Sequence, residues 1–171
     1  DRLLPVLKAM NTVSVRAVCT GTGLHAKAVA EKMDAAYCTS DYREVLKDDT
    51  VNAVLIATRH HDHGPMVLEA LRAEKHIFVE KPLCLSEEEL EEITALYAEK
   101  AEKGLQLMVG FNRRFSPHMA EAKRFFQERK NPLVMLFRVN AGALPFEHWV
   151  QDPEVGGGRI VGEACHFIDF M

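Results

Sequence analysis

His76-Ile-Phe-Val-Glu-Lys-Pro82 is the stretch around which the predicted fold is organised. Its centre, Ile-Phe-Val, is a short apolar run of strand-forming residues and is typical of a buried strand. Pro82 ends the strand because proline has no N–H for a sheet ladder. Glu80 and Lys81 then stand at the strand's carboxyl end, where open α/β sheets bind ligands. The tripeptide alone favours a solvated ion pair, and the rest of the chain decides against that interpretation.

The composition is that of an ordinary globular protein. Of its 171 residues, 47% are hydrophobic and 27% charged, and this length is enough for one domain, or one domain and part of another. The net charge of −4 favours neither a nucleic-acid partner nor an anionic membrane. No apolar run is long enough to span a bilayer, and the charged start followed by a helical pattern favours no signal peptide. The four cysteines are far apart and lack metal-ligand spacing, which indicates reduced thiols in a cytoplasmic protein without a metal.

Strand and helix patterns alternate along the chain. Strands are predicted at residues 12–19, 37–38, 51–58, 77–79, 105–111 and 133–139. Helices are predicted at residues 1–10, 41–47, 65–73, 86–103, 117–129 and 159–170, with another that ends near residue 33. This alternation indicates a parallel sheet with helices on both faces, whose strand carboxyl ends share one edge. Thr58, Glu80-Lys81 and Phe111-Asn112 are expected at that edge.

Capping residues support several of these helices. Ser40 is available to cap the helix at 41–47, and Ser116 the helix at 117–129. Ser86 and Glu89 have the spacing of a capping box. Pro65 suits the first position of the helix predicted at 65–73.

Two registers place a dinucleotide-binding fold on this pattern. In the first, Gly21-x-Gly23-x-x-Ala26 is the phosphate-binding fingerprint after strand one, and Asp41 lies about 20 residues further on. In the second, residues 12–19 are strand two, and strand one with its glycine loop precedes Asp1. The sequence pattern alone favours the two registers equally. Against the first, Asp41 opens a helix and does not end a strand.

A set of segments in one order resembles the glucose-fructose oxidoreductase / inositol dehydrogenase family, also called Gfo/Idh/MocA. The segments are Val54-Leu-Ile-Ala-Thr58, residues 60–65, Glu80-Lys81-Pro82, Val109-Gly-Phe-Asn-Arg-Arg114 and residues 156–169. The similarity covers essentially the whole chain. Residues 156–170 (GGGRIVGEACHFIDF) carry a closer likeness, to the oxidoreductase portion of bacterial proteins that fuse this module behind a zinc alcohol-dehydrogenase-like domain.

The resemblance implies a Rossmann-type doubly wound parallel sheet and the start of a second α/β domain. It assigns residues 1–111 to an NAD(P)-binding domain and residues 112–171 to the beginning of a substrate and oligomerisation domain. The family's glycine loop falls a full βαβ unit before the strand that ends in Ala57-Thr58. This selects the second register and makes the chain a fragment that lacks strand one, whose absence is expected to leave unpaired strand edges.

The resemblance also implies an NAD(P)-dependent oxidoreductase that moves hydride between nicotinamide and an alcohol carbon of a sugar, cyclitol or related polyol, as a homo-oligomer. Such a reaction needs a proton acceptor and a cation to stabilise the alkoxide. Lys81 matches the family's catalytic lysine, and His166 matches its catalytic histidine. The family often has aspartate four residues before that histidine, where this chain has Gly162. Glu163 is the expected replacement, with Asp169 as the alternative.

The residues implied to contact NAD or NADP come from several parts of the chain. They are Thr20, Ala57, Thr58, His60, His63, Glu80, Lys81, Pro82, Asn112 and Arg113. For Arg114, contact with the cofactor and a surface ion pair are equally favoured. The absence of an acid in Cys19-Thr20-Gly21-Thr22 and the presence of His25 or Lys27 tilt the prediction weakly towards NADP.

Other interpretations stay open. The histidines of residues 60–63 also suit a metal or a solvated loop, although the reaction needs no metal. The missing glycine loop and Gly162 favour a regulatory or interaction domain that has lost its cofactor. The first register, in contrast, makes the chain a complete small nucleotide-binding module.

Overall fold

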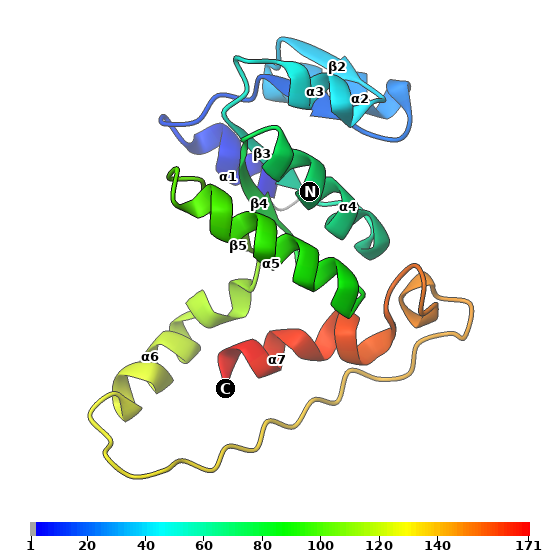
Figure 1. Cartoon of the computed structure of the whole chain (residues 1–171). Helices are drawn as coiled ribbons and strands as arrows, with labels where there is room; N and C mark the ends of the chain where they lie inside the picture. Colours follow the sequence, from blue (N-terminus) through cyan, green and yellow to red (C-terminus); the bar gives the residue numbers. More distant parts are fainter. Residues whose placement is uncertain (1–2) are drawn as a thin grey trace. The chain divides into compact units, whose positions relative to one another are not determined.

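The computed structural model describes residues 3–171, and the chain divides after Ala53 into two compact units. Each unit contains parallel strands with helices packed on them, as the alternating pattern predicts (Figure 1). The predicted helix at 1–10 is present, and its first two residues lie outside the described part of the chain. Within the described residues, no helix is both long and apolar enough to cross a membrane.

The first unit is built on two parallel strands. Its elements are α1 Leu3–Ala9, β1 Ala17–Cys19, α2 Gly23–Met33, β2 Tyr37–Thr39 and α3 Tyr42–Lys47. Helix α2 packs on both strands and buries Ala26, Ala30 and Met33, because residues spaced by three or four lie on one helix face. It ends where Asp34 adopts the left-handed conformation, with φ of 55°.

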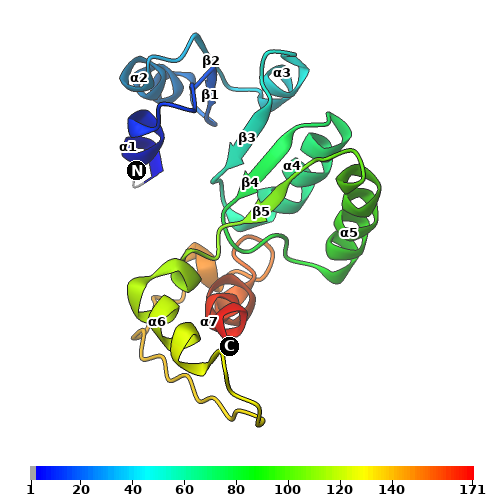
Figure 2. The same ribbon diagram turned by 90° about the vertical axis from the view of Figure 1, so that its left-hand side faces the viewer.

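The second unit is built on a sheet of order β3-β4-β5. Its first elements are β3 Ala53–Ile56, α4 His60–Arg72, β4 His76–Val79, α5 Glu87–Ala101 and β5 Leu107–Val109. Helices α4 and α5 pack against each other and lie on the same side of the sheet (Figure 2). Leu71 of α4 and Ile93 of α5 are the largest fully buried apolar side chains, so this helix pair and the strand beneath it form the core of the unit.

Short helices and one long extended segment complete the second unit. The helices are the 3₁₀ turn η1 Asn112–Phe115, α6 Pro117–Phe126, the 3₁₀ turn η2 Trp149–Gln151, the π-helical turn η3 Ile160–Ala164, and α7 Cys165–Phe170. Between α6 and η2 the chain runs extended (Figure 1). Val134 and Leu136 of this segment are 95% and 89% exposed.

The observed strand pairing follows the second of the two registers. In a doubly wound sheet of order 3-2-1-4-5-6, the third strand pairs with the second. The first register makes β3 the third strand, yet β3 pairs with β4 and is in a different sheet from β2. The second register makes β1 and β2 strands two and three, and β3 to β5 strands four to six, which are the pairs observed. A Cβ added at Gly21 or Gly23 would meet nothing within 4 Å, so no close contact requires glycine there.

Several predicted boundaries are wrong. Residues 133–139 are not a strand, because no described strand lies beside them to take up their backbone hydrogen bonds. Helix α4 begins at His60, so Pro65 lies inside it. Asp41 and not Ser40 caps α3, because the Asp41 carboxylate accepts the N–H of Arg43 at 3.0 Å. The other strands and helices are mostly shorter than their patterns, since only paired or packed residues keep regular geometry.

Two predicted helix caps are confirmed. The Ser86 hydroxyl accepts the N–H of Glu89 at 3.2 Å, and the Ser116 hydroxyl accepts that of Met119 at 3.4 Å. The Glu89 carboxylate in turn accepts the N–H of Leu85 at 3.1 Å. The start of α5, which follows the Glu80-Lys81 turn, is therefore fixed by two hydrogen bonds that involve Glu89, one through its N–H and one through its carboxylate.

Candidate functional site

The strands β3, β4 and β5 end at one edge of their sheet, as predicted. The Glu80 N–H donates to the Ile56 carbonyl at 2.9 Å, and the Gly110 N–H donates to the Val79 carbonyl at 2.7 Å. The three segments therefore stay side by side just beyond their last paired residues. This arrangement brings the ends that carry Thr58, Glu80-Lys81 and Asn112 to the same edge.

Lys81 is held by the π-helical turn η3. Its ammonium Nζ donates to the carbonyl oxygen of Gly162 at 2.6 Å. A π-helical turn is rare and occurs frequently at functional sites. Because a hydrogen bond from a charged donor is stronger than one between neutral groups, this contact fixes where the ammonium lies. Lys81 and His166 line the same open hollow of about 950 Å³.

His166, on α7, presents a buried imidazole to this hollow. Its residue is 9% exposed, and its Nδ1 has no hydrogen-bond partner among residues 3–171. Burial, and then the positive charges of Lys81 and Arg113, hold the pKa of His166 below its ordinary value of 6.5, against an opposing effect of Asp169. The ring is therefore neutral near pH 7 and is able to accept a proton.

The two acids expected to support His166 are engaged elsewhere. The Glu163 carboxylate accepts a hydrogen bond from the Arg159 Nε at 2.5 Å. Asp169 forms an ion pair with Arg114, whose Nε donates to it at 2.9 Å. Of the two roles considered for Arg114, the structure shows the ion pair. Glu163 does line the hollow with Lys81 and His166, and its predicted support of the histidine stays a prediction.

His60 fills the space beside Gly162. Its imidazole is 7% exposed and meets the Trp149 ring edge-on, with centroids 4.8 Å apart. Its Nδ1 donates to the Gly156 carbonyl at 2.7 Å, since a carbonyl oxygen only accepts. A Cβ added to Gly162 would lie 2.7 Å from that carbonyl oxygen and 3.1 Å from the His60 ring. Packing therefore excludes a side chain, including the aspartate that the family often has, at position 162.

The glycine-rich loop before η3 caps helix α4. Arg59, at the N-cap of α4, makes no side-chain cap, and the His61 N–H donates instead to the Val155 carbonyl at 3.2 Å. A Cβ on Gly156 would lie 2.4 Å from the Val150 Cα, so only glycine brings the loop this close. These contacts explain why α4 starts at its histidines and not at the proline.

His63 joins the ends of β3 and β4. The residue is 1% exposed, and its Nδ1 and Nε2 face the carbonyls of Pro82 at 2.6 Å and Thr58 at 3.3 Å. The shorter contact is a hydrogen bond in which the protonated Nδ1 donates to the carbonyl of Pro82, directly after Lys81. His63 therefore holds the turn that presents Lys81. No group of three His, Cys, Asp or Glu residues in the described part of the chain is arranged to hold a metal ion.

The surroundings of Glu80 fit the ribose end of a dinucleotide. Its half-buried carboxylate has no hydrogen-bond or ion-pair partner among residues 3–171. It lies against Gly110, where an added Cβ would be 2.9 Å from the Glu80 Oε2. A carboxylate without a partner is able to accept hydrogen bonds from hydroxyl groups such as those of a ribose. Asn112 and Arg113 begin η1, one residue after Gly110, and Thr20 belongs to the first unit.

Sequence reasoning missed part of this arrangement. Gly162 was recognised as a missing acid but not as the acceptor of the Lys81 ammonium, and Trp149 and Arg159 were assigned no role. The triple glycine was the available signal: Gly157 and Gly158 have φ of 74° and 68°, a conformation that favours glycine and marks a tight loop.

The fold defines a class, the Rossmann-type α/β proteins with parallel sheets, and the comparisons with known proteins give the family. Residues 1–111 match the model of the Gfo/Idh/MocA family, described as an oxidoreductase family with an NAD-binding Rossmann fold. The chain belongs to this family, as its motifs predict. The more specific likeness to fusions with a zinc alcohol-dehydrogenase-like domain is not tested by these matches.

The relatives include proteins of known activity. An uncharacterized oxidoreductase of Bacillus subtilis, YrbE, is 37% identical over 165 residues, which is 92% of this chain and 45% of the relative. The scyllo-inositol 2-dehydrogenase (NAD(+)) of Bacillus subtilis is 43% identical over 109 residues, which is 63% of this chain and 31% of the relative. A levoglucosan dehydrogenase solved with NADH and levoglucosan superposes with a TM-score of 0.81 at 26% identity, covering 99% of this chain and 47% of that one. The chain thus spans less than half the length of these relatives.

Gly162→Ala should destabilise the protein. Glycine to alanine inside a helix usually stabilises by about 1 kcal/mol, but here the added methyl meets the Gly156 carbonyl and the His60 ring, which should cost about 1–3 kcal/mol. Urea unfolding of the complete protein measures the change. Gly23→Ala, at the open start of α2, is the matched control. A Gly162→Ala protein as stable as the control would contradict the packing described here.

The unfolding free energy should fall as the pH is lowered from 8 to 5. Burial lowers the pKa of both His60 and His166 below 6.5, so the unfolded chain takes up these protons at a higher pH than the folded chain. Stability from these groups is therefore complete above pH 6.5 and is lost below it. Urea titrations of the complete protein across this range give the slope. A His60→Asn/His166→Asn variant should show a smaller slope, and an equal slope would show that these two rings are not the cause.

Proposed function

We propose that the protein transfers hydride between NAD or NADP and an alcohol carbon of a sugar, cyclitol or related polyol. The observation that carries this proposal is the convergence of Lys81 and His166 on one hollow beside the ends of β4 and β5. The substrate class is supported by relatives named for scyllo-inositol and levoglucosan. When bound, the nicotinamide supplies the hydride donor or acceptor.

The two side chains suit the two demands of alcohol oxidation. The neutral His166 ring accepts the proton of the substrate hydroxyl. The Lys81 ammonium donates a hydrogen bond to the same oxygen and stabilises the negative charge that develops on it. Its bond to the Gly162 carbonyl holds the ammonium in place before substrate arrives. Glu163 contributes by fixing Arg159 on the wall of the hollow.

We place the cofactor along the edge formed by β3, β4 and β5. Glu80 accepts hydrogen bonds from ribose hydroxyls, while His63 positions Pro82 by donating a hydrogen bond to its carbonyl. The proposed contact set is Thr20, Ala57, Thr58, His60, His63, Glu80, Lys81, Pro82, Asn112 and Arg113. Residues 1–111, the span of the family match, are then the cofactor domain, and residues 112–171 begin the substrate domain.

The cellular setting is also a proposal. A cytoplasmic location is supported by four free cysteines. A homo-oligomer is supported by the exposed apolar side chains of the extended segment, Val134 and Leu136 among them. Fusion to a further domain is supported by the likeness of residues 156–170 to bifunctional bacterial proteins.

Lys81→Ala and His166→Ala should each lower kcat by at least about 100-fold in the complete protein, because each removes one of the two groups that act on the reacting oxygen. The assay is NADH formation at 340 nm with scyllo-inositol or levoglucosan, and circular dichroism should stay unchanged. Lys123→Ala and His118→Ala, at exposed positions of α6, are the matched controls.

Undiminished activity in both site variants would refute the assignment. A second candidate, a regulatory domain without cofactor, is favoured by the His166 Nδ1, which has no hydrogen-bond partner within the part of the chain that the structure describes. It predicts a wild-type protein that neither oxidises polyols nor changes NADH or NADPH fluorescence on titration.

A further inference from the structure

The hollow beside Lys81 and His166 is strongly basic, although the whole chain carries a net charge of −4. Its cationic lining residues are Lys81, Arg113, Arg138 and Arg159, and its one acidic lining residue is Glu163. Positive charges gathered in a concave site raise the local concentration of anions. Whether this excess of positive charge is available to a ligand depends on which of these side chains are paired with a carboxylate.

Only one of the arginines is neutralised within the hollow. Arg159 is paired with Glu163 and also donates to the Gly142 carbonyl at 2.7 Å. Among residues 3–171, Arg113 and Arg138 have no carboxylate partner within 4.0 Å. With His166 neutral, Lys81, Arg113 and Arg138 are left as uncompensated positive charges.

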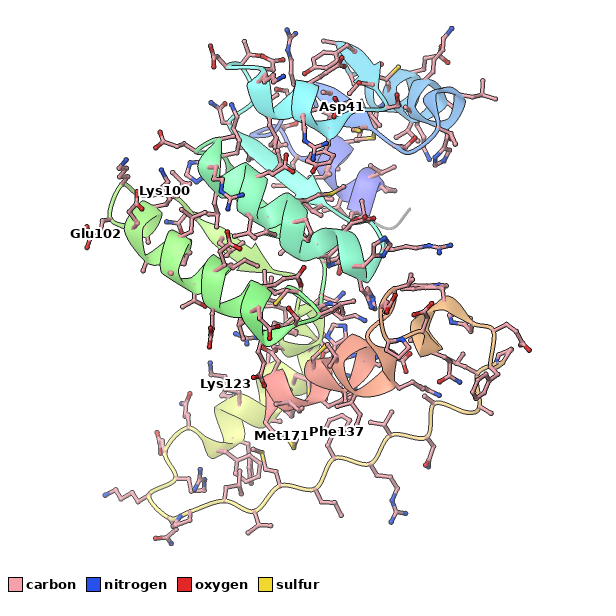
Figure 3. All side chains as sticks on the ribbon, turned by 45° about the vertical axis from the view of Figure 1, so that its right-hand side comes forward. Asp41, Lys100, Glu102, Lys123, Phe137 and Met171 are labelled. Carbon is pink, nitrogen blue, oxygen red and sulfur yellow. The ribbon has the colours of Figure 1, made fainter. Side chains whose placement is uncertain are left out.

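Arg113 is held in a way that leaves its donors free. Its guanidinium carbon lies 4.8 Å from the centroid of the Phe167 ring on α7, and the Phe137 ring packs on Phe167 at 4.9 Å. Phe137 lies beside α7, so the extended segment that carries Arg138 lies next to this stack (Figure 3). A guanidinium stacked on an aromatic ring keeps its in-plane N–H groups for a bidentate oxyanion.

We propose that this hollow takes a substrate that bears an oxyanion, a carboxylate or a phosphate, and that Arg113 and Arg138 bind that group beside Lys81 and His166. The inference deepens the proposed function and rests on it, because the proposed function defines which kind of carbon reacts. The class of substrate is therefore an acidic sugar or cyclitol, such as a uronate, an aldonate or a sugar phosphate. Arginine suits this role because its planar fork matches both kinds of oxyanion.

The hollow belongs to the substrate and not to the phosphates of the cofactor. Of the proposed cofactor contacts, only Lys81 and Arg113 line it. The other proposed cofactor contacts, Thr58 and His63 among them, are not part of this lining. The hollow instead continues along the extended segment to Asn140 and Gly142, which leaves room for a substrate longer than its reacting carbon.

Calorimetric titration of the complete protein, preloaded with NADH, tests the proposal. NADH cannot oxidise an alcohol, so binding is measured without turnover. The probes are D-glucuronate, D-glucose 6-phosphate and D-glucose. At least one anionic sugar should bind about tenfold or more tightly than glucose, with an advantage that shrinks as salt is added.

Arg138→Gln should lower the ratio of anionic to neutral affinity by about tenfold. Arg124→Gln, which breaks an exposed ion pair with Glu121 on α6, should leave the ratio unchanged. Preference for glucuronate identifies a carboxylate ligand, and preference for glucose 6-phosphate a phosphate. Equal affinities for all three sugars, or an Arg138→Gln ratio equal to wild type, would overturn the proposal.

The proposed function and this inference fail separately. A protein that oxidises scyllo-inositol but binds all three sugars equally keeps the first and loses the second. A protein that prefers an anionic sugar, measured without NADH if NADH does not bind, but transfers no hydride keeps the anion site and loses the dehydrogenase.

Discussion

The hydrogen bond from the Lys81 ammonium to the Gly162 carbonyl is the contact on which the site depends. It joins the end of β4 to a π-helical turn that lies 81 residues further along the chain. That turn keeps its position because the His60 imidazole packs beside it and donates a hydrogen bond to the Gly156 carbonyl. The loop that supplies this carbonyl also caps α4, the helix that carries His60, so helix, loop and turn hold one another.

In this arrangement the Lys81 ammonium and the His166 imidazole line the same hollow. The Lys81 ammonium donates a hydrogen bond to the Gly162 carbonyl. The His166 ring is buried, its Nδ1 has no partner among the described residues, and its pKa is lowered. A cation next to a neutral base is the pair that alcohol oxidation uses, since one group stabilises the oxygen anion and the other removes the proton. Glu163 and Asp169 are paired with Arg159 and Arg114, which leaves Arg113 and Arg138 to set the charge of the hollow.

The sequence predicted what local chemistry determines and missed what long-range packing determines. The caps at Ser86 and Ser116 and the meeting of the strand ends follow from residue type and spacing. The start of α4 at His60 was missed because a distant loop carbonyl, that of Val155, and not a nearby side chain, accepts the N–H of His61. The strand predicted at 133–139 failed because apolar alternation does not supply a neighbouring strand. The exclusion of a side chain at Gly162 depends on the Gly156 carbonyl, which lies against position 162 through the folding of the loop, and on the ring of His60, about a hundred residues away in sequence.

A crystal structure of the complete protein with NADH and a bound polyol tests the convergence of Lys81 and His166 most directly. We expect one substrate hydroxyl within hydrogen-bond distance of both the Lys81 Nζ and the His166 ring, with Lys81 still bonded to the Gly162 carbonyl at about 2.6 Å. A polyol bound outside this hollow, or a Lys81 ammonium turned away from both Gly162 and the substrate, would contradict the site described here.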